Sequence, residues 1–230
     1  MLQMTNIGKT FLTGQVQTKA LDQINLEVDE GEFVTITGPS GCGKTTFLNI
    51  AGLLENATAG QYLLDGEDVS RLGDRQRAKL RNQKIGFIFQ SFNLMPDLNL
   101  FDNVDVPLRY RGLGRGERHQ RIEEALTNVG LWSRRKHLPA QLSGGQQQRV
   151  AIARALAGSP RFLLADEPTG NLDSKTAAGV MSLLHEINAK GTTIIMVTHD
   201  PVLAQNSRRN IDILDGQIRD DARRSTAAVA

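Results

Sequence analysis

The order of apolar and polar residues along the chain predicts most of its elements. Residues 24–28 alternate apolar with polar, as a half-buried strand does. Four other runs are almost wholly apolar, as buried strands are, and they span residues 33–37, 85–89, 161–165 and 193–198. Helical periodicity separates several of these runs, with apolar residues three and four positions apart. The pattern predicts an α/β fold.

Asp-Gly pairs mark two hairpins. Residues 60–70 turn at Asp65-Gly66, and residues 211–218 turn at Asp215-Gly216. Residues 1–32 are predicted to be strands and turns, with a loop over 12–19. Phe11, just before that loop, is either a core aromatic or a platform on which an adenine ring stacks, since every base offers a π-face.

Residues 91–140 show no strand pattern and predict an inserted helical subdomain. Pro96, Pro107 and Pro139 punctuate this stretch, and residues 117–129 have the apolar spacing of an amphipathic helix. The arginines of residues 109–121 are interspersed with glutamates, so a solvated helix face is favoured over contact with anionic lipid. These arginines are Arg109, Arg111, Arg115, Arg118 and Arg121.

A glycine-rich loop lies between the apolar run 33–37 and a helical pattern. Residues 38–45 read GPSGCGKT, which fits the phosphate-loop pattern G-x-x-x-x-G-K-[ST]. Glycines let successive backbone N–H groups turn toward an anion, and the following helix start adds unpaired donors. We expect Lys44 to reach the β- and γ-phosphates and the Thr45 hydroxyl to bind Mg²⁺. The chain therefore binds a nucleoside triphosphate.

A second helix start follows much later, at residues 142–146, which read LSGGQ. Ser143 stands where an N-cap belongs, and capping alone would explain it. Two consecutive glycines, Gly144 and Gly145, lose much entropy on folding, but they suit a backbone that approaches an anion at a helix N-terminus. The sequence thus predicts two phosphate-binding helix starts.

Polar residues end three of the predicted strands. Asp166 and Glu167 follow one strand, Gln90 another and His199 a third. Ligands of α/β proteins bind at the carboxyl ends of parallel strands. There, Asp166 suits Mg²⁺ and Glu167 can polarise an attacking water. The other histidines are expected to be structural or exposed, and they are His119, His137 and His185.

Composition narrows the class of protein. The chain has 230 residues and a net charge of +2, so charge gives no reason to expect nucleic-acid binding. Its single cysteine, Cys42, excludes an internal disulfide framework. No apolar run reaches the roughly 20 residues that cross a bilayer, and residues 1–6 lack the features of a signal peptide. We expect a cytosolic protein whose membrane role, if any, comes through a partner.

The order of these motifs resembles the nucleotide-binding ATPase subunit of ABC transporters, and the likeness covers essentially the whole chain. It is closest to the lipoprotein-release, macrolide-export and cell-division group, through residues 89–96, 141–156 and 165–173. The resemblance implies an α/β fold with a P-loop NTPase core and mixed sheet, an N-terminal antiparallel β subdomain and an inserted helical subdomain. One domain over 1–230 is then expected, with 1–90 and 141–220 as the core, 91–140 as the helical subdomain and 221–230 as a frayed tail.

The resemblance also implies a role for each motif residue. Phe11 matches the adenine-stacking aromatic, although tyrosine is more usual there. Thr45, Gln90 and Asp166 would bind Mg²⁺, Glu167 would be the general base, and His199 would contact the γ-phosphate. The ATP-binding set would be Gly38, Pro39, Ser40, Gly41, Cys42, Gly43, Lys44, Thr45 and Thr46, completed by Ser143, Gly144, Gly145, Gln146 and Asp173 from a second copy.

The implied protein is an ATPase that works as a head-to-tail dimer and drives a separate integral membrane permease subunit. It would lie on the cytoplasmic face of the inner membrane and bind no nucleic acid. Four alternatives remain: a DNA-repair ATPase, which needs coiled-coil arms; a translation ATPase, which needs tandem cassettes; a switch that regulates a membrane-anchored cell-envelope or cell-division complex; and a non-hydrolytic module. Sustained heptads and an internal repeat are both missing from the sequence, and Glu167 is present, so the switch is the strongest of the four.

Overall fold

The computed structural model describes residues 1–14, 16–205 and 207–223, and they form two compact units. The first unit holds residues 1–79 together with the chain from Thr193 onward, and the second holds Leu80–Thr192. Helix α2 (Asp74–Lys84) spans the boundary in sequence. This division differs from the expected single core with an insertion at 91–140, because the second unit also takes in strands and helices on either side of that stretch.

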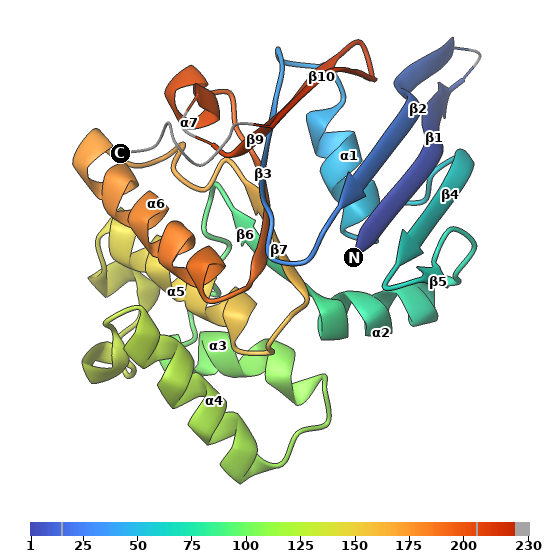
Figure 1. The fold of residues 1–230 in the computed structure, drawn as a ribbon. Coiled ribbons are helices and arrows are strands. Elements are labelled where there is room, and N and C mark those ends of the chain that lie inside the picture. The colour runs from blue at the N-terminus through green and yellow to red at the C-terminus, as the bar shows by residue number, and fades with distance from the viewer. Residues whose placement is uncertain (15, 206, 224–230) are drawn as a thin grey trace. The chain divides into compact units, whose positions relative to one another are not determined.

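A four-stranded antiparallel sheet forms the N-terminal part of the first unit. Its strands are β1 (Leu2–Thr13), β2 (Val16–Val28), β4 (Ala59–Leu64) and β5 (Glu67–Asp68), in the order β2-β1-β4-β5. The expected loop over residues 12–19 is wrong. Phe11 pairs with Thr18 across the long β1–β2 hairpin, drawn in blue in Figure 1. The two strands extend almost to the turn because their backbone N–H and C=O groups hydrogen-bond to each other, even where the side chains are polar.

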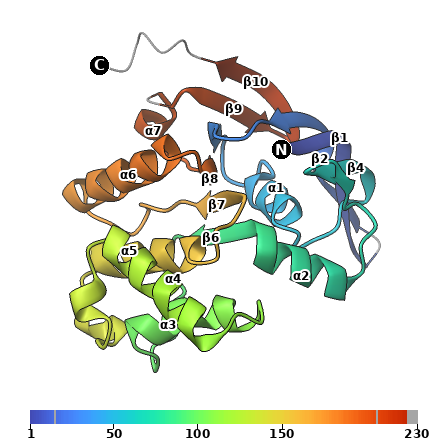
Figure 2. The ribbon, with the colours of Figure 1, turned by 60° about the horizontal axis from the view of Figure 1, so that its bottom comes forward.

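The first unit also contains a mixed sheet. Strand β3 (Phe33–Thr37) runs parallel to both β8 (Thr193–Val197) and β9 (Arg209–Leu214), and β9 pairs antiparallel with β10 (Gln217–Arg223). Helices α1 (Lys44–Ala51) and α7 (Pro201–Gln205) belong to the same unit (Figure 2). Val34 and Ile36 on β3 are fully buried, as the apolar run predicts, and so is Phe47 on α1.

Strand β10 corrects the expectation that residues 221–230 fray. Residues 221–223 lie in β10, and the rest of that segment, 224–230, lies outside the described residues. The buried Arg209 side chain explains the order of this strand. Its guanidinium donates to Asp221 Oδ1 and Oδ2 at 2.8 Å and to Glu32 Oε2 at 2.7 Å. The hydrogen bonds from Arg209 lower the pKa of Asp221.

Asp221→Asn tests this pairing. A carboxyl whose pKa is lowered by folding stabilises the fold above its unfolded pKa, and this contribution disappears as the pH falls through the folded value. We expect the variant to lose about 1 kcal/mol of unfolding free energy at pH 7, a small value because Asp221 is partly exposed. The difference should shrink below about pH 4. Urea unfolding at several pH values measures it, and a pH-independent difference would contradict the ion pair.

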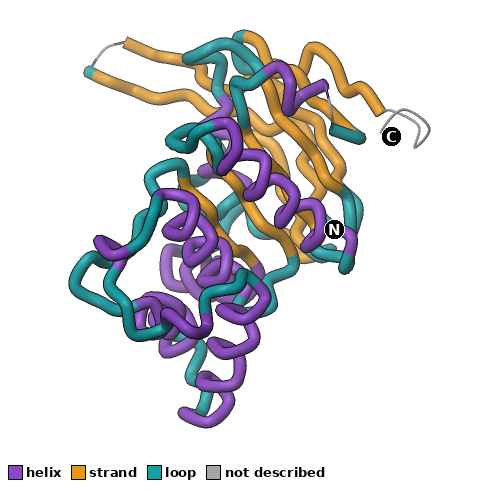
Figure 3. Tube along the Cα trace, turned by 90° about the vertical axis from the view of Figure 1, so that its left-hand side faces the viewer, coloured by secondary structure: helices purple, strands orange, loops and turns teal. Residues whose placement is uncertain are grey.

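The second unit combines two parallel strands with helices. Strand β6 (Ile85–Phe89) pairs in parallel with β7 (Phe162–Asp166). Figure 3, in which helices are purple, shows that helices predominate in this unit. They are α3 (Leu100–Arg109), α4 (Arg115–Asn128), α5 (Gly144–Leu156) and α6 (Ser174–Ala189), with short 3₁₀ turns at Trp132–Arg134 and Pro139–Gln141. Pro107 lies inside α3, so the expectation that it interrupts the helical stretch is wrong.

Arginines of residues 91–140 have partners within the second unit. Arg109 and Arg118 both pair with the buried Asp105 at 2.7 Å, which joins α3 to α4. Arg121 pairs with Glu117, and Arg111 donates to the carbonyls of Asn82 and Gly158. These arginines therefore contribute to packing and helix pairing, which favours the structural interpretation over lipid contact.

Candidate functional site

The phosphate loop lies between β3 and α1, in the first unit. Gly38, Gly41 and Gly43 have φ values of 147°, 80° and 108°, in the region that favours glycine. Gly43 is the N-cap of α1, so the first-turn N–H groups of the helix are available to an anion. Thr45 is exposed in that first turn. The loop therefore has the backbone shape that a phosphate group requires.

Lys44 is buried against the loop itself. Its ammonium donates to the carbonyl oxygens of Gly38 at 2.7 Å and Pro39 at 2.8 Å. The buried Cys42 thiol lies 3.8 Å from the same nitrogen. These contacts keep the lysine charge at the phosphate loop, from which it can move to a bound phosphate oxygen.

Two glycines of the loop touch neighbouring strands. A Cβ at Gly38 would lie 2.0 Å from the Ile213 carbonyl oxygen on β9, and one at Gly43 would lie 2.5 Å from the Ala20 carbonyl oxygen on β2. Neither distance is tolerable between non-bonded heavy atoms. The loop thus depends on glycine for packing as well as for its dihedral angles.

The β9–β10 turn connects the loop to β2. The Gly216 N–H donates to Cys42 O at 3.0 Å, and the Asp22 N–H donates to Gly216 O at 2.8 Å. Gly216 has φ of 76°, and a Cβ there would lie 2.8 Å from Ala20 O. A residue near the C-terminus therefore fixes the phosphate loop against the N-terminal hairpin.

Phe11 and His199 also belong to the first unit. Phe11 lies on β1, half-buried, with the Lys9 ammonium 4.9 Å from the centre of its ring. His199 is exposed just after β8, whose end is held by a hydrogen bond from Thr198 N–H to Ile36 O at 3.1 Å. His199 thus follows a strand that pairs directly with β3, the strand that leads into the phosphate loop.

The second unit carries the remaining strand-end residues. Gln90 follows β6, Asp166 ends β7 and Glu167 comes next, so the parallel pairing of Phe89 with Asp166 places these residues at one edge. Glu167 has φ of 45°, which is a strained conformation for a residue other than glycine. Gln90 Nε2 donates to Asn171 Oδ1 at 3.2 Å, and Asn171 Nδ2 donates to Gln90 O at 3.1 Å.

Residues 142–146, LSGGQ, which we call the signature sequence, start α5 through a capping box. Ser143 Oγ accepts from Gln146 N–H at 3.4 Å, and Gln146 Oε1 accepts from Ser143 N–H at 3.1 Å. Asp173 is the N-cap of α6, and its carboxylate accepts hydrogen bonds from Thr176 N–H at 3.1 Å and from the Thr176 hydroxyl at 2.6 Å. The hydroxyl bond is the main reason that the pKa of Asp173 is lowered.

Gly145 has a packing role that the sequence does not reveal. A Cβ at Gly145 would lie 2.1 Å from Thr176 Cγ2, and the next nearest atom is 3.6 Å away. By contrast, a Cβ at Gly144 would meet its nearest atom, Leu172 Cδ2, at 3.3 Å. The second glycine of LSGGQ therefore leaves room for the Thr176 methyl group of helix α6 in the same chain.

The oxygen donors of the predicted metal set fit Mg²⁺. Thr45 offers a hydroxyl, Gln90 an amide oxygen and Asp166 a carboxylate, and Mg²⁺ prefers one or two such ligands together with phosphate oxygens and water. Within residues 1–14, 16–205 and 207–223, no three His, Cys, Asp or Glu side chains gather as a metal cage would require. In the same described residues, no helix is both long and apolar enough to span a membrane.

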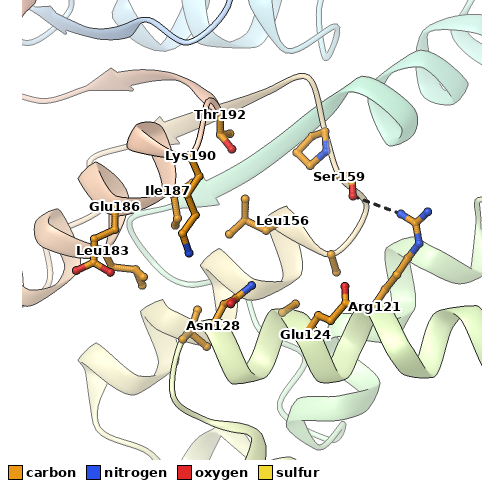
Figure 4. Close-up of a pocket in the computed structure, with 14 residues that line it drawn as sticks. Arg121, Glu124, Asn128, Leu156, Ser159, Leu183, Glu186, Ile187, Lys190 and Thr192 are labelled. Carbon is orange, nitrogen blue, oxygen red and sulfur yellow. Dashed lines mark hydrogen bonds between the residues drawn. The ribbon is translucent and has the colours of Figure 1, made fainter.

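A cavity of about 320 Å³ in the second unit lies among α4, α6 and the C-terminal end of α5 (Figure 4). Leu156, Leu183 and Ile187 give it an apolar lining, and Arg121 donates to Ser159 Oγ at its edge at 3.4 Å. The cavity residues include none of the predicted site residues. The chemistry expected from the sequence therefore lies elsewhere.

Several residues that shape the site were missed from the sequence. They are Gly216, Thr176, Gln148 and Arg154, which act through contacts with segments far away in the chain. One signal was present: Gln148 stands three and four positions before Ala151 and Ile152, so it lies on the same completely buried face of α5.

An α/β fold with a glycine-rich phosphate loop between a strand and a helix defines a nucleoside-triphosphate-binding protein. Comparison with known proteins identifies the family. Residues 21–170 match the ABC transporter family. The chain therefore belongs to that family, and it is an ATP-binding, ATP-hydrolysing subunit, as its motifs predict.

Three relatives illustrate the match. An uncharacterized ABC transporter ATP-binding protein, YknY of Bacillus subtilis, is 48% identical over 95% of this chain and 95% of its own length. The macrolide export ATP-binding/permease protein MacB of Marinobacter nauticus is 47% identical over 96% of this chain but only 34% of its own length. The dimeric ATP-binding cassette MJ0796, solved in a post-hydrolysis state with ADP and Pi, is 44% identical and superposes with a TM-score of 0.88 over 98% of this chain and 100% of that one.

Gly216→Ala tests the β9–β10 turn, with Gly66→Ala as a matched control. Both glycines end an Asp-Gly turn, at φ of 76° and 79°, but a Cβ at Gly66 would meet nothing within 4 Å. Both variants should therefore lose about 1–2 kcal/mol of stability through backbone strain. Only Gly216→Ala should also weaken ATP binding, by about tenfold, measured by calorimetric titration. Equal affinities in the two variants would show that the turn does not position the loop.

Gly145→Ala and Thr176→Ser test the packing role of the signature glycine. We expect Gly145→Ala alone to cost about 1–3 kcal/mol of stability through overpacking. The double variant removes the clashing Cγ2 and keeps the hydroxyl that bonds Asp173, so it should regain most of the stability and of the ATP turnover. Thermal unfolding and phosphate release measure the two. Stability regained without turnover would mean that Gly145 itself must approach a phosphate.

Proposed function

We propose that this chain is the motor subunit of an ABC transporter and that it works as a head-to-tail dimer with two ATP molecules between the copies. The proposal rests on two helix N-termini that begin with glycine residues, one at Gly43 and one at Ser143, each of which can offer backbone N–H groups to a phosphate. A single nucleotide has one γ-phosphate, so the second helix start is best explained by ATP bound on another copy. MJ0796, similar over nearly the whole chain, is dimeric.

In this proposal the first unit binds the phosphates. Residues 38–46 surround them with backbone N–H groups, and Lys44 moves from its carbonyl acceptors to the β- and γ-phosphates. Phe11 stacks on the adenine and His199 contacts the γ-phosphate. The relatives' names support ATP as the nucleotide, since both the YknY and MacB descriptions specify ATP binding.

The second unit supplies the hydrolytic residues. Glu167 acts as general base and takes a proton from the water that attacks the γ-phosphorus in line, while the bond to the β-phosphate oxygen breaks and ADP leaves. Gln90, Asp166 and the Thr45 hydroxyl hold Mg²⁺, which neutralises phosphate charge when bound. Ser143, Gly144, Gly145 and Gln146 bind the γ-phosphate of the partner copy, and Asp173 lies at the seam between the copies.

A separate integral membrane permease subunit would be the partner that moves. The MacB relatives are described as ATP-binding/permease proteins, and this chain spans 34% of the length of the Marinobacter protein. We propose that another chain provides the corresponding permease and that this subunit works against it at the cytoplasmic face of the inner membrane. ATP closes the dimer, and loss of the γ-phosphate, with its charge, opens it again.

Glu167→Gln tests the proposed dimer. Without the carboxylate, ATP should persist, so the variant should elute as a dimer in size-exclusion chromatography with ATP and Mg²⁺ and as a monomer without them. ATP turnover should fall by about a hundredfold or more. The matched control Glu123→Gln, on the exposed face of α4, should behave like the wild type. ATP binding without dimerisation in Glu167→Gln would contradict the head-to-tail arrangement.

A further inference from the structure

We propose that Gln148 and Arg154, on helix α5, are positioning residues that hold Gln90 and the segment after Glu167 in fixed register with the signature sequence at the start of the same helix. The inference rests on the proposed function, in which Gln90 binds Mg²⁺ and the signature binds the partner's ATP. It adds two residues that touch neither nucleotide nor metal and that act through the ones that do.

Gln148 joins both strand ends of the second unit. Its side chain is 0% exposed, and its Nε2 donates to Phe89 O at 3.3 Å and to Pro168 O at 2.6 Å. Phe89 immediately precedes Gln90, and Pro168 immediately follows Glu167. One amide group thus fixes the backbone beside the proposed metal ligand and beside the proposed general base.

Arg154 holds the chain just beyond Gln90. Its guanidinium donates to Phe92 O at 3.0 Å and also to Asn93 O. Phe92 and Asn93 have φ values of 60° and 49°, so the chain reverses sharply at these two residues. The planar fork of an arginine can serve two successive carbonyls, which a lysine does less well because it is a point charge. Burial lowers the pKa of Arg154, which indicates that its charge is partly desolvated.

Asn171, in the segment that follows β7, also holds Gln90 in place. It exchanges two hydrogen bonds with Gln90, at 3.2 Å and 3.1 Å, and a Cβ at Gly170 would lie 2.7 Å from Gln90 Nε2. Gln90 is therefore restrained on three sides, by the residues that follow β7, by Gln148 through Phe89, and by Arg154 through Phe92. All of these contacts lie within the second unit.

The energetics of Gln148 argue against a purely structural role. Its Oε1 is buried and accepts no hydrogen bond from any described residue. An unsatisfied buried acceptor costs about 1–3 kcal/mol, and an apolar side chain of similar size would avoid that cost. Its neighbours on α5, Val150 and Ala151, are fully buried and apolar. The glutamine therefore aligns the two strand ends, although its unbonded oxygen lowers the stability of the buried core.

The consequence is mechanical. Gln148 lies five residues after Ser143 and Arg154 lies eleven after it, so both are on the same rigid helix. A displacement of the signature toward or away from the partner's ATP would therefore shift the Gln90 segment of its own chain. In each copy, helix α5 would therefore couple two sites. One is the partner's ATP, which the signature contacts, and the other is Gln90, the proposed Mg²⁺ ligand of the copy's own site.

Hydrogen exchange in the nucleotide-free protein is the first test. We expect Gln148→Met and Arg154→Ala to raise the exchange rates of the amides at residues 90–93 and 169–171 by about tenfold or more, since the contacts that order them are lost. The amides of residues 38–46 should not change. Gln147→Met, which loses only a bond to Leu142 O at 3.3 Å, just before the same helix, should leave both segments unchanged.

Magnesium dependence is the second test. The Mg²⁺ concentration for half-maximal ATP turnover should rise about 10–100-fold in Gln148→Met and Arg154→Ala, as is usual when residues that orient metal ligands are removed. The KM for ATP should stay within about threefold, because the phosphate loop is not altered. Arg154→Lys should restore part of the activity, since a lysine can still donate to one of the two carbonyls.

Two results would overturn the inference. One is unchanged exchange at residues 90–93 and unchanged Mg²⁺ dependence in folded variants. The other is a lower melting temperature with equal losses at every Mg²⁺ concentration, which is what a merely structural residue produces. Failure of the proposed function is recognised separately, because Glu167→Gln would then bind ATP without forming the ATP-dependent dimer.

Discussion

The close packing of a glycine-rich loop against two strands is the constraint on which the first unit depends. Gly38 lies against the backbone of β9 and Gly43 against the backbone of β2, both at distances that exclude any side chain. The loop can therefore present its N–H groups outward only if the strands behind it are correctly placed. Anion binding by the loop is thus a property of the whole unit, because the eight-residue motif supplies the dihedral angles and the neighbouring strands supply the support.

The second unit solves a different problem, that of aligning polar groups from separate strands. Here the alignment comes from side-chain amides and a guanidinium that bond to backbone carbonyls, in particular those of Phe89, Phe92 and Pro168. Such bonds are directional and cost free energy when left unmade, so they specify one arrangement more strongly than apolar contacts would. The left-handed backbone of Glu167 shows that this arrangement is maintained at some conformational cost.

The sequence predicts the elements well where periodicity and turn chemistry agree. The buried runs became β3, β6, β7 and β8, and the Asp-Gly turn of β9 and β10 lies where expected. The loop expected over residues 12–19 was wrong because the paired backbones form a hairpin there, although most of the side chains are polar and exposed. The contacts of Gly216, Thr176 and Gln148 could not be predicted, since each depends on which distant segment lies beside it in the fold.

The bond between Gly216 and Cys42 has a consequence for the way the protein is made. About three quarters of the chain lies between these two residues in sequence. Synthesis on the ribosome proceeds from the N-terminus, so the phosphate loop emerges long before the β9–β10 turn that fixes it exists. The nucleotide site is therefore completed only after the β9–β10 turn has been made, and nascent chains remain unable to bind ATP tightly until that hairpin has formed.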